Sequence, residues 1–99
     1  MKTALLACLA LAACAPLAPA LREGQLALAQ EKLQVSPAHL EAGRQLFVHR
    51  CGGCHATPAV DELRPDEWRE ELKDMAPRAR LSAPEAVQVY QYLWAAAQP

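Results

Sequence analysis

The chain is poor in strand-forming residues, in aromatic side chains and in net charge. Aromatic residues make up 5% of its 99 residues, and Ala, Leu, Glu, Gln and Arg dominate the remainder. We therefore expect an all-α fold and at most one small domain. The formal net charge of −1 gives no electrostatic footprint for nucleic acid, which requires a basic face.

The apolar run at the N-terminus is too short to cross a bilayer. Met1 and Lys2 are followed, up to Ala13, by small and apolar residues without a charge. This length fits the apolar region of a signal peptide. We therefore expect the protein to be exported, which places it in the periplasm or the cell envelope.

The run ends in Leu-Ala-Ala-Cys at residues 11–14, a pattern that resembles the bacterial lipobox. The resemblance implies that residues 1–13 are a signal peptide and that Cys14 carries lipid and anchors the protein to a membrane. Ordinary signal cleavage at the small-x-small site of residues 18–20 is the alternative, and it would release a soluble exported form.

Residues 14–35 are expected to be a tether. They contain Pro16 and Pro19, and the apolar spacing of residues 21–35 is too poor for more than a weak helix. A flexible tether would let an anchored domain swing between partners near a membrane. The folded domain is expected to cover residues 36–99.

Three helices are expected within residues 36–99. The first spans about residues 37–50, behind a serine N-cap and with a proline at its first position. The second spans about residues 65–74 and also begins at a proline. The third begins at Ser82, which forms a capping box with Glu85.

Apolar residues at spacings of three and four give each expected helix an inner face. These residues are Leu40, Gly43, Leu46 and Phe47; Trp68, Leu72 and Met75; and Val87, Tyr90, Leu93 and Trp94. Tyr92 is expected on a neighbouring face. A helical domain this small struggles to build a stable core alone, so a buried cofactor would supply the missing apolar mass.

The chemistry of the chain points to Cys51, Cys54 and His55, which form the pattern C-x-x-C-H. In c-type haem attachment each thiol adds across one vinyl group of the porphyrin, and the two-residue gap lets one helical turn present both sulfurs. The histidine that follows points its imidazole at the iron. We therefore expect one covalently bound haem c at these three residues.

A zinc site, a thioredoxin-type redox pair and a disulfide are the alternatives for this motif. Zinc needs two more ligands, for which His39 and His49 are the available histidines. A thioredoxin pair expects a strand–helix context, which the expected elements lack. Export permits a disulfide, but a disulfide would not need His55.

Gly43, Phe47 and the C-x-x-C-H motif together resemble the G-x-x-x-F-x-x-x-C-x-x-C-H opening of small bacterial monohaem cytochromes c. In that family the glycine and the aromatic residue of the first helix cross the last helix, which carries a Tyr-Leu pair. Tyr92 and Leu93 stand where that pair would be. The resemblance implies a small cytochrome c-like fold of about three helices around a covalent haem.

The resemblance also implies that Met75 is the second axial ligand of the iron. Met75 is the only methionine besides Met1, and it follows the expected second helix, near a proline, where a loop can aim its thioether. It comes 20 positions after His55, a shorter interval than in mitochondrial-type cytochromes. Core packing is the commoner use of methionine, and His39 and His49 are the weaker alternatives as ligands.

Pro58 and Trp68 are the other expected neighbours of the haem. In the family a backbone carbonyl near a proline accepts from the proximal histidine, and Pro58 is the nearest proline to His55, with loop stiffening as its alternative. Trp68 either packs on the haem, donates to a propionate or packs in an ordinary core. Arg78 and Arg80 could pair with propionates, but exposed charge is their default role.

Seven of the eleven acidic residues lie within residues 61–74. A solvated helix face is the simpler interpretation of this run. The alternative is that the run steers a basic partner surface toward the haem.

The expected function is single-electron transfer between exported redox partners, such as a dehydrogenase, an oxidase or another cytochrome. No substrate is transformed, so the protein is not expected to be an enzyme. The alternative is a haem-based sensor or gas-binding module whose sixth ligand is displaceable or absent. A peroxidase would need distal acid–base groups, which the sequence does not convincingly supply.

Overall fold

The computed structural model describes residues 18–51 and 59–99. In these ranges the chain forms four α-helices and no strand: α1 (Glu23–Leu33), α2 (Pro37–Leu46), α3 (Pro65–Arg78) and α4 (Ala83–Ala96). A π-helical segment, η2 (Phe47–Cys51), continues α2 directly. The expected all-α fold is confirmed, with one helix more in the described ranges than the three expected.

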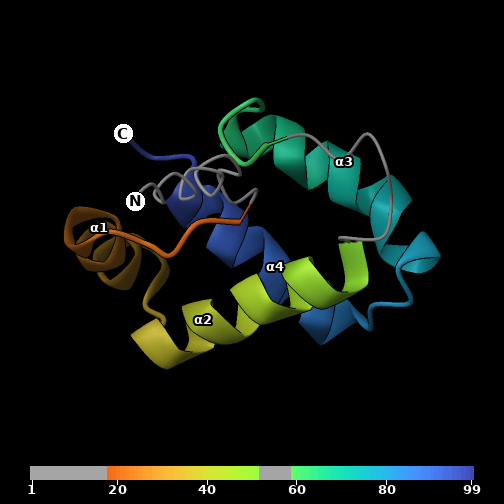
Figure 1. The fold of residues 1–99 in the computed structure, drawn as a ribbon, viewed down its shortest axis with the longest axis horizontal. Coiled ribbons are helices and arrows are strands. Elements are labelled where there is room, and N and C mark those ends of the chain that lie inside the picture. The colour runs from red at the N-terminus through yellow and green to blue at the C-terminus, as the bar shows by residue number, and fades with distance from the viewer. Residues whose placement is uncertain (1–17, 52–58) are drawn as a thin grey trace, which may run out of the picture.

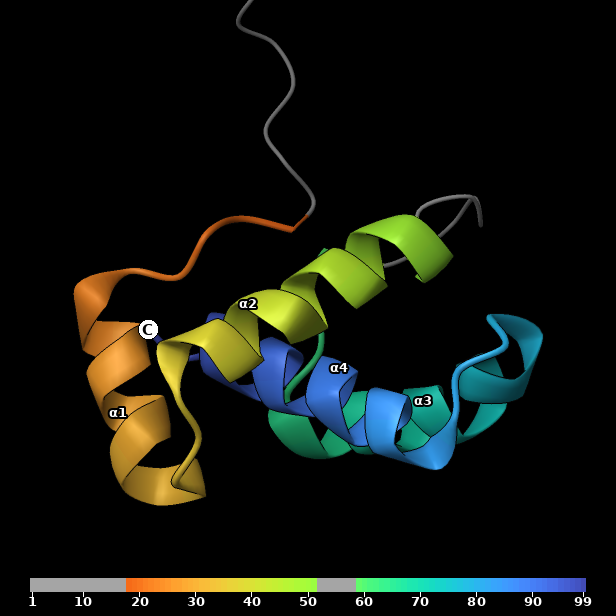
Figure 2. The same cartoon turned by 90° about the horizontal axis from the view of Figure 1, so that it is seen from below.

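Helix α4 is the centre of the fold. It lies between α2 and α3 (Figure 1, Figure 2), and α1 packs against its C-terminal half. Val89, Tyr92 and Leu93 are fully buried, whereas Val87 is 53% exposed. The expected stripe on this helix was therefore wrong at Val87 and did not include Tyr92, because the partners α2 and α3 decide which faces are covered.

The starts of α2 and α4 follow the capping signals of the sequence. The side chain of Ser36 accepts a hydrogen bond from the His39 N–H at 3.1 Å. Ser82 and Glu85 form the expected capping box, in which each side chain accepts from the backbone N–H of the other at 3.2 and 2.9 Å. Both predicted helix starts are confirmed.

Helix α3 runs one turn further than the sequence suggested. It ends at Arg78 and contains Pro77, where the expected end was near residue 74. A proline in the last turn removes a single backbone hydrogen bond, which a helix end tolerates better than a helix interior. Met75 therefore lies inside α3, and the expectation of a loop at this residue was wrong.

Residues 18–35 do not form the flexible tether that we expected. Helix α1 packs on α4, and Ala29 is fully buried there. The side-chain amide of Gln25 donates to the carbonyls of Ala96 and Gln98 at 3.3 and 2.9 Å. This helix buries a glutamine and an alanine instead of large apolar residues, which explains why its spacing gave a weak signal.

The stretch before α1 is fixed by two side chains of the other helices. Arg44 donates from Nε to the carbonyl of Ala18 at 2.8 Å, and the hydroxyl of Tyr92 donates to the carbonyl of Pro19 at 2.7 Å. Burial raises the pKa of Tyr92 to about 12. The phenol therefore stays protonated and continues to donate throughout the neutral pH range.

Helices α2 and α4 cross closely at Gly43. A Cβ atom at this position would overlap the carbonyl oxygen of Gln88 and would lie 3.2 Å from the Cβ of Tyr92. One turn later the ring of Phe47 packs on Tyr92, with 6.2 Å between ring centroids. The crossing thus brings together Gly43, Phe47 and Tyr92, the residues that the family resemblance placed at the contact of the first and last helices.

We expect Gly43→Ala to lower the free energy of unfolding by about 2 kcal/mol, because the added methyl group forces α2 and α4 apart. The higher helix propensity of alanine offsets at most about 1 kcal/mol of the underlying loss. Gly24→Ala in α1 is the matched control, since no atom of the described residues lies within 4 Å of its added Cβ. It should stabilise the protein by about 0.5 kcal/mol. Chemical denaturation measures both values, and equal effects would contradict the close crossing.

Candidate functional site

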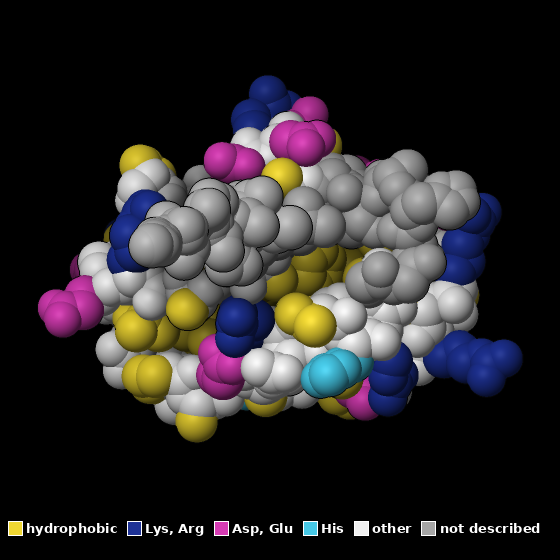
Figure 3. Space-filling model, viewed as in Figure 1, with side chains coloured by type: hydrophobic (Ala, Val, Ile, Leu, Met, Phe, Trp, Pro, Cys, Tyr) yellow, Lys and Arg dark blue, Asp and Glu magenta, His cyan; other side chains and the backbone are white. Residues whose placement is uncertain are grey.

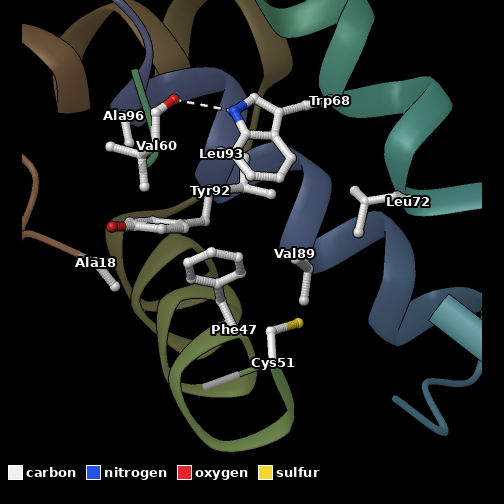
Figure 4. Close-up of a cluster of buried hydrophobic side chains, with 10 residues drawn as sticks. All are labelled: Ala18, Phe47, Cys51, Val60, Trp68, Leu72, Val89, Tyr92, Leu93 and Ala96. Atoms are coloured by element: carbon white, nitrogen blue, oxygen red, sulfur yellow. Dashed lines mark hydrogen bonds between the residues drawn. The ribbon is translucent and has the colours of Figure 1, made fainter. Parts of the chain in front are cut away.

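Cys51 is the described member of the C-x-x-C-H motif, and it is the last residue of η2. Its side chain is 1% exposed and belongs to the largest apolar cluster of the described residues. Figure 4 shows its sulfur directed toward the side on which Val89 and Leu72 lie. The local geometry therefore turns this thiol inward, against apolar side chains.

Three elements supply the cluster around Cys51. Phe47 comes from η2, Trp68 and Leu72 come from α3, and Val89 comes from α4. The rings of Phe47 and Trp68 meet edge to face with 6.0 Å between centroids, a favoured aromatic geometry. Trp68 and Val89 are fully buried. The sequence identified Phe47, Trp68 and Leu72 as inner residues but missed Val89, which was not included in the expected apolar stripe of its helix.

Met75 belongs to the same region of α3. It is partly buried and packs against the cluster that contains Cys51. Trp68 and Leu72 are buried on the same side of the helix, as the spacing of four and three residues predicted. The structure therefore brings Cys51 and Met75 to one apolar cluster from two separate elements.

Apolar side chains are visible in a recess on the face of the molecule that Figure 3 shows. In the same orientation α2 lies in front of α4, and α3 lies on the other side of α4 (Figure 1, Figure 2).

Trp68 has a defined partner for its indole N–H. Nε1 donates to the carbonyl of Val60 at 2.9 Å, and the bond is buried. The side chain thereby fixes the turn before α3 to the core (Figure 4). Of the three roles expected for Trp68, core packing agrees with this geometry, and donation to a propionate would require this bond to break.

The two histidines outside the motif have ordinary surroundings. Nε2 of His39 lies 2.6 Å from Oε1 of Gln91, so the ring joins α2 to α4. His49 is exposed on η2. The described geometry gives neither ring a place in the cluster of Cys51 and Met75.

The charges of α3 pair mainly with one another. The ion pairs are Arg64–Asp66, Arg64–Glu67, Lys73–Glu70 and Arg78–Asp74, with distances of 3.4, 3.8, 3.0 and 3.8 Å. A hydrogen bond from Arg64 holds the pKa of Asp66 below its usual value. These local pairs support the interpretation of the acidic run as a solvated helix face.

Four expected site residues lie outside the described residues: Cys14, Cys54, His55 and Pro58. Within residues 18–51 and 59–99, no group of three or more His, Cys, Asp or Glu side chains is placed to hold a metal ion. None of the helices in the described part of the chain has the length and apolar composition needed to cross a membrane.

Comparisons of the chain with protein-family models, with curated proteins and with solved structures find no match.

Proposed function

We propose that this protein is an electron-transfer cytochrome with one covalent haem c. Cys51 and Cys54 would form the two thioether bonds, and His55 and Met75 would be the axial ligands of the iron. The observation that carries the proposal is the placement of Cys51 and Met75 at one apolar cluster, reached from η2 and α3. The close crossing of α2 and α4 at Gly43 supports the same family resemblance.

The described residues fit such a group. The Cys51 side chain is buried among apolar side chains, and Met75 packs against the same cluster. An apolar macrocycle that packs against this cluster would lose part of its contact with water, which would stabilise both the macrocycle and the small core. A bound haem supplies one-electron chemistry, because its iron alternates between the ferrous and the ferric state.

Each protein residue has one task in this proposal. Cys51 and Cys54 would hold the macrocycle covalently, and His55 would be one protein ligand of the iron. Met75 would be the second, and a thioether ligand favours the reduced iron and raises the reduction potential. With both positions held by the protein, the group would supply electron transfer and not chemistry on a bound molecule.

The proposed partners, with which the protein would exchange electrons, are redox proteins in the periplasm or the cell envelope.

If Cys14 carries lipid, four backbone steps of about 3.6 Å join it to Ala18, a reach of about 14 Å. Ala18 is buried, and its carbonyl accepts from Arg44. An anchored domain would therefore remain close to the membrane surface, which replaces the swinging tether that the sequence suggested.

Carbon monoxide added to the reduced protein tests the proposed function against the sensor alternative. A carrier whose sixth position is held by Met75 should bind carbon monoxide slowly or not at all without denaturation. The visible spectrum of the reduced protein reports the binding. Rapid binding in the folded protein would favour a haem-based sensor or gas-binding module instead.

A further inference from the structure

Arg50 joins η2 to the turn between α3 and α4. Its Nη1 donates to the carbonyl oxygen of Arg80 at 2.9 Å, and its Nη2 lies 3.6 Å from Oε2 of Glu85. Arg50 directly precedes Cys51, and Arg80 comes five residues after Met75. One side chain therefore connects the segments that carry the buried thiol and the thioether.

The turn that receives Arg50 has a fixed backbone. Arg80 adopts a left-handed conformation with a φ of 58°. Its N–H donates to the carbonyl of Pro77 at 3.1 Å, and the N–H of Leu81 donates to the carbonyl of Ala76 at 3.0 Å. These two bonds close the end of α3, so the Arg80 carbonyl is a rigid acceptor.

The second partner of Arg50 is also held in place. Glu85 accepts from the Ser82 N–H at 2.9 Å as part of the capping box of α4. That hydrogen bond, with the nearby charge of Arg50, holds the pKa of Glu85 below its usual value. Glu85 is therefore an ionised, oriented carboxylate at neutral pH, and Arg50 contacts two fixed groups at once.

We propose that Arg50 is a positioning residue that keeps the Met75 end of α3 against the haem. The inference rests on the proposed function, since Met75 can be a ligand only if the haem is bound. Arg50 acts through the α3–α4 turn. Without this bridge, the end of α3 would be held less firmly to η2, and Met75 would be held less firmly against the haem.

Arg78 offers a matched control for the loss of one positive charge. It lies on the same end of α3, but its ion pair with Asp74, at 3.8 Å, joins two residues of the same helix. Both of these side chains are at least 70% exposed. Arg78→Gln therefore changes the net charge as Arg50→Gln does, and among the described residues it breaks no connection between elements.

The test is the rate at which imidazole binds to the oxidised full-length holoprotein, followed by the loss of the methionine–iron charge-transfer band. Imidazole can bind only after Met75 leaves, so this rate reports how firmly the thioether is held. We expect Arg50→Gln to raise the rate by roughly fivefold and Arg78→Gln to leave it unchanged. Glu85→Gln, which retains a capping acceptor but loses the charge, should raise it by about twofold. Far-ultraviolet circular dichroism checks that each variant is folded.

The outcomes distinguish this inference from the proposed function. Equal rates in the wild type and in Arg50→Gln, with the band present in both, overturn the positioning role and leave the cytochrome assignment standing. Equal acceleration by Arg50→Gln and Arg78→Gln also overturns it, because lost charge would then be the cause. Absence of the band from the wild type would instead contradict the binding of Met75 to the iron, and the positioning role of Arg50 would fail with it.

Discussion

Met75→Leu is expected to lower the reduction potential of the holoprotein by about 100 mV or more. Leucine preserves most of the volume that Met75 fills against the cluster, but it has no sulfur to bind the iron. The ferrous state therefore loses the ligand that favours it. Redox titration followed by absorbance measures the shift. The charge-transfer band of the oxidised protein should disappear at the same time, and carbon monoxide should bind readily to the reduced variant.

Leu72→Met is the matched control for this experiment. Leu72 lies one turn earlier on the same side of α3, is 5% exposed and belongs to the same cluster. The substitution conserves volume and leaves Met75 in place, so both the band and the potential should stay near their wild-type values. If Met75→Leu and Leu72→Met shift the potential equally, packing and not ligation controls it, and the axial assignment fails.

Replacing Cys51 and Cys54 together by alanine is expected to abolish covalent haem. Each thiol forms one thioether bond by adding across a vinyl group, so the double variant has no bond that survives denaturation. Cys51→Ala alone should keep one thioether through Cys54 and leave one vinyl group unsaturated. Its reduced pyridine complex should then absorb at a longer wavelength than that of the wild type. Removing the buried sulfur should also destabilise the protein by about 1 kcal/mol.

Cys14→Ala provides the control for the cysteine variants. Cys14 belongs to the lipobox-like pattern and not to C-x-x-C-H. The substitution should therefore leave the haem content unchanged and should affect only membrane attachment, which cell fractionation measures. Loss of haem from Cys14→Ala, or full retention of covalent haem by the double variant, would contradict the assignment of Cys51 and Cys54.

Local signals in the sequence predicted the helix starts correctly. Ser36 and Ser82 cap their helices as expected, because a side-chain oxygen and the backbone N–H groups that it satisfies lie within three residues of each other. The end of α3 was missed, since Pro77 favours a stop but is tolerated in a last turn. The π-helical form of η2 had no signal of this kind.

Tertiary contacts explain the larger errors. Helix α1 is joined to the C-terminal part of the chain by Gln25, which donates to two carbonyls more than 70 positions away. The spacing of apolar residues in the sequence cannot predict a hydrogen bond of this kind. Val89 and Val87 are both apolar positions of α4, and only the placement of α2 and α3 decides that the first is buried and the second exposed.

The candidate site was partly predictable. The spacing of Trp68, Leu72 and Met75 placed all three on the inner side of one helix, and they lie there. The bond from Trp68 to the Val60 carbonyl and the bridge made by Arg50 could not be predicted, because each joins residues whose separation in space is set by the whole fold. Sequence reasoning therefore identified the chemical groups better than the side chains that hold them in position.

The central claim is that the chain carries one covalent haem, and the most direct test is the spectrum of its reduced pyridine complex after denaturation and extraction. The protein should be produced in a host that matures c-type cytochromes. The account predicts one haem per polypeptide, retained through extraction, with the spectrum of a haem whose two vinyl groups are both saturated. A folded polypeptide that leaves such a host without bound haem would contradict it.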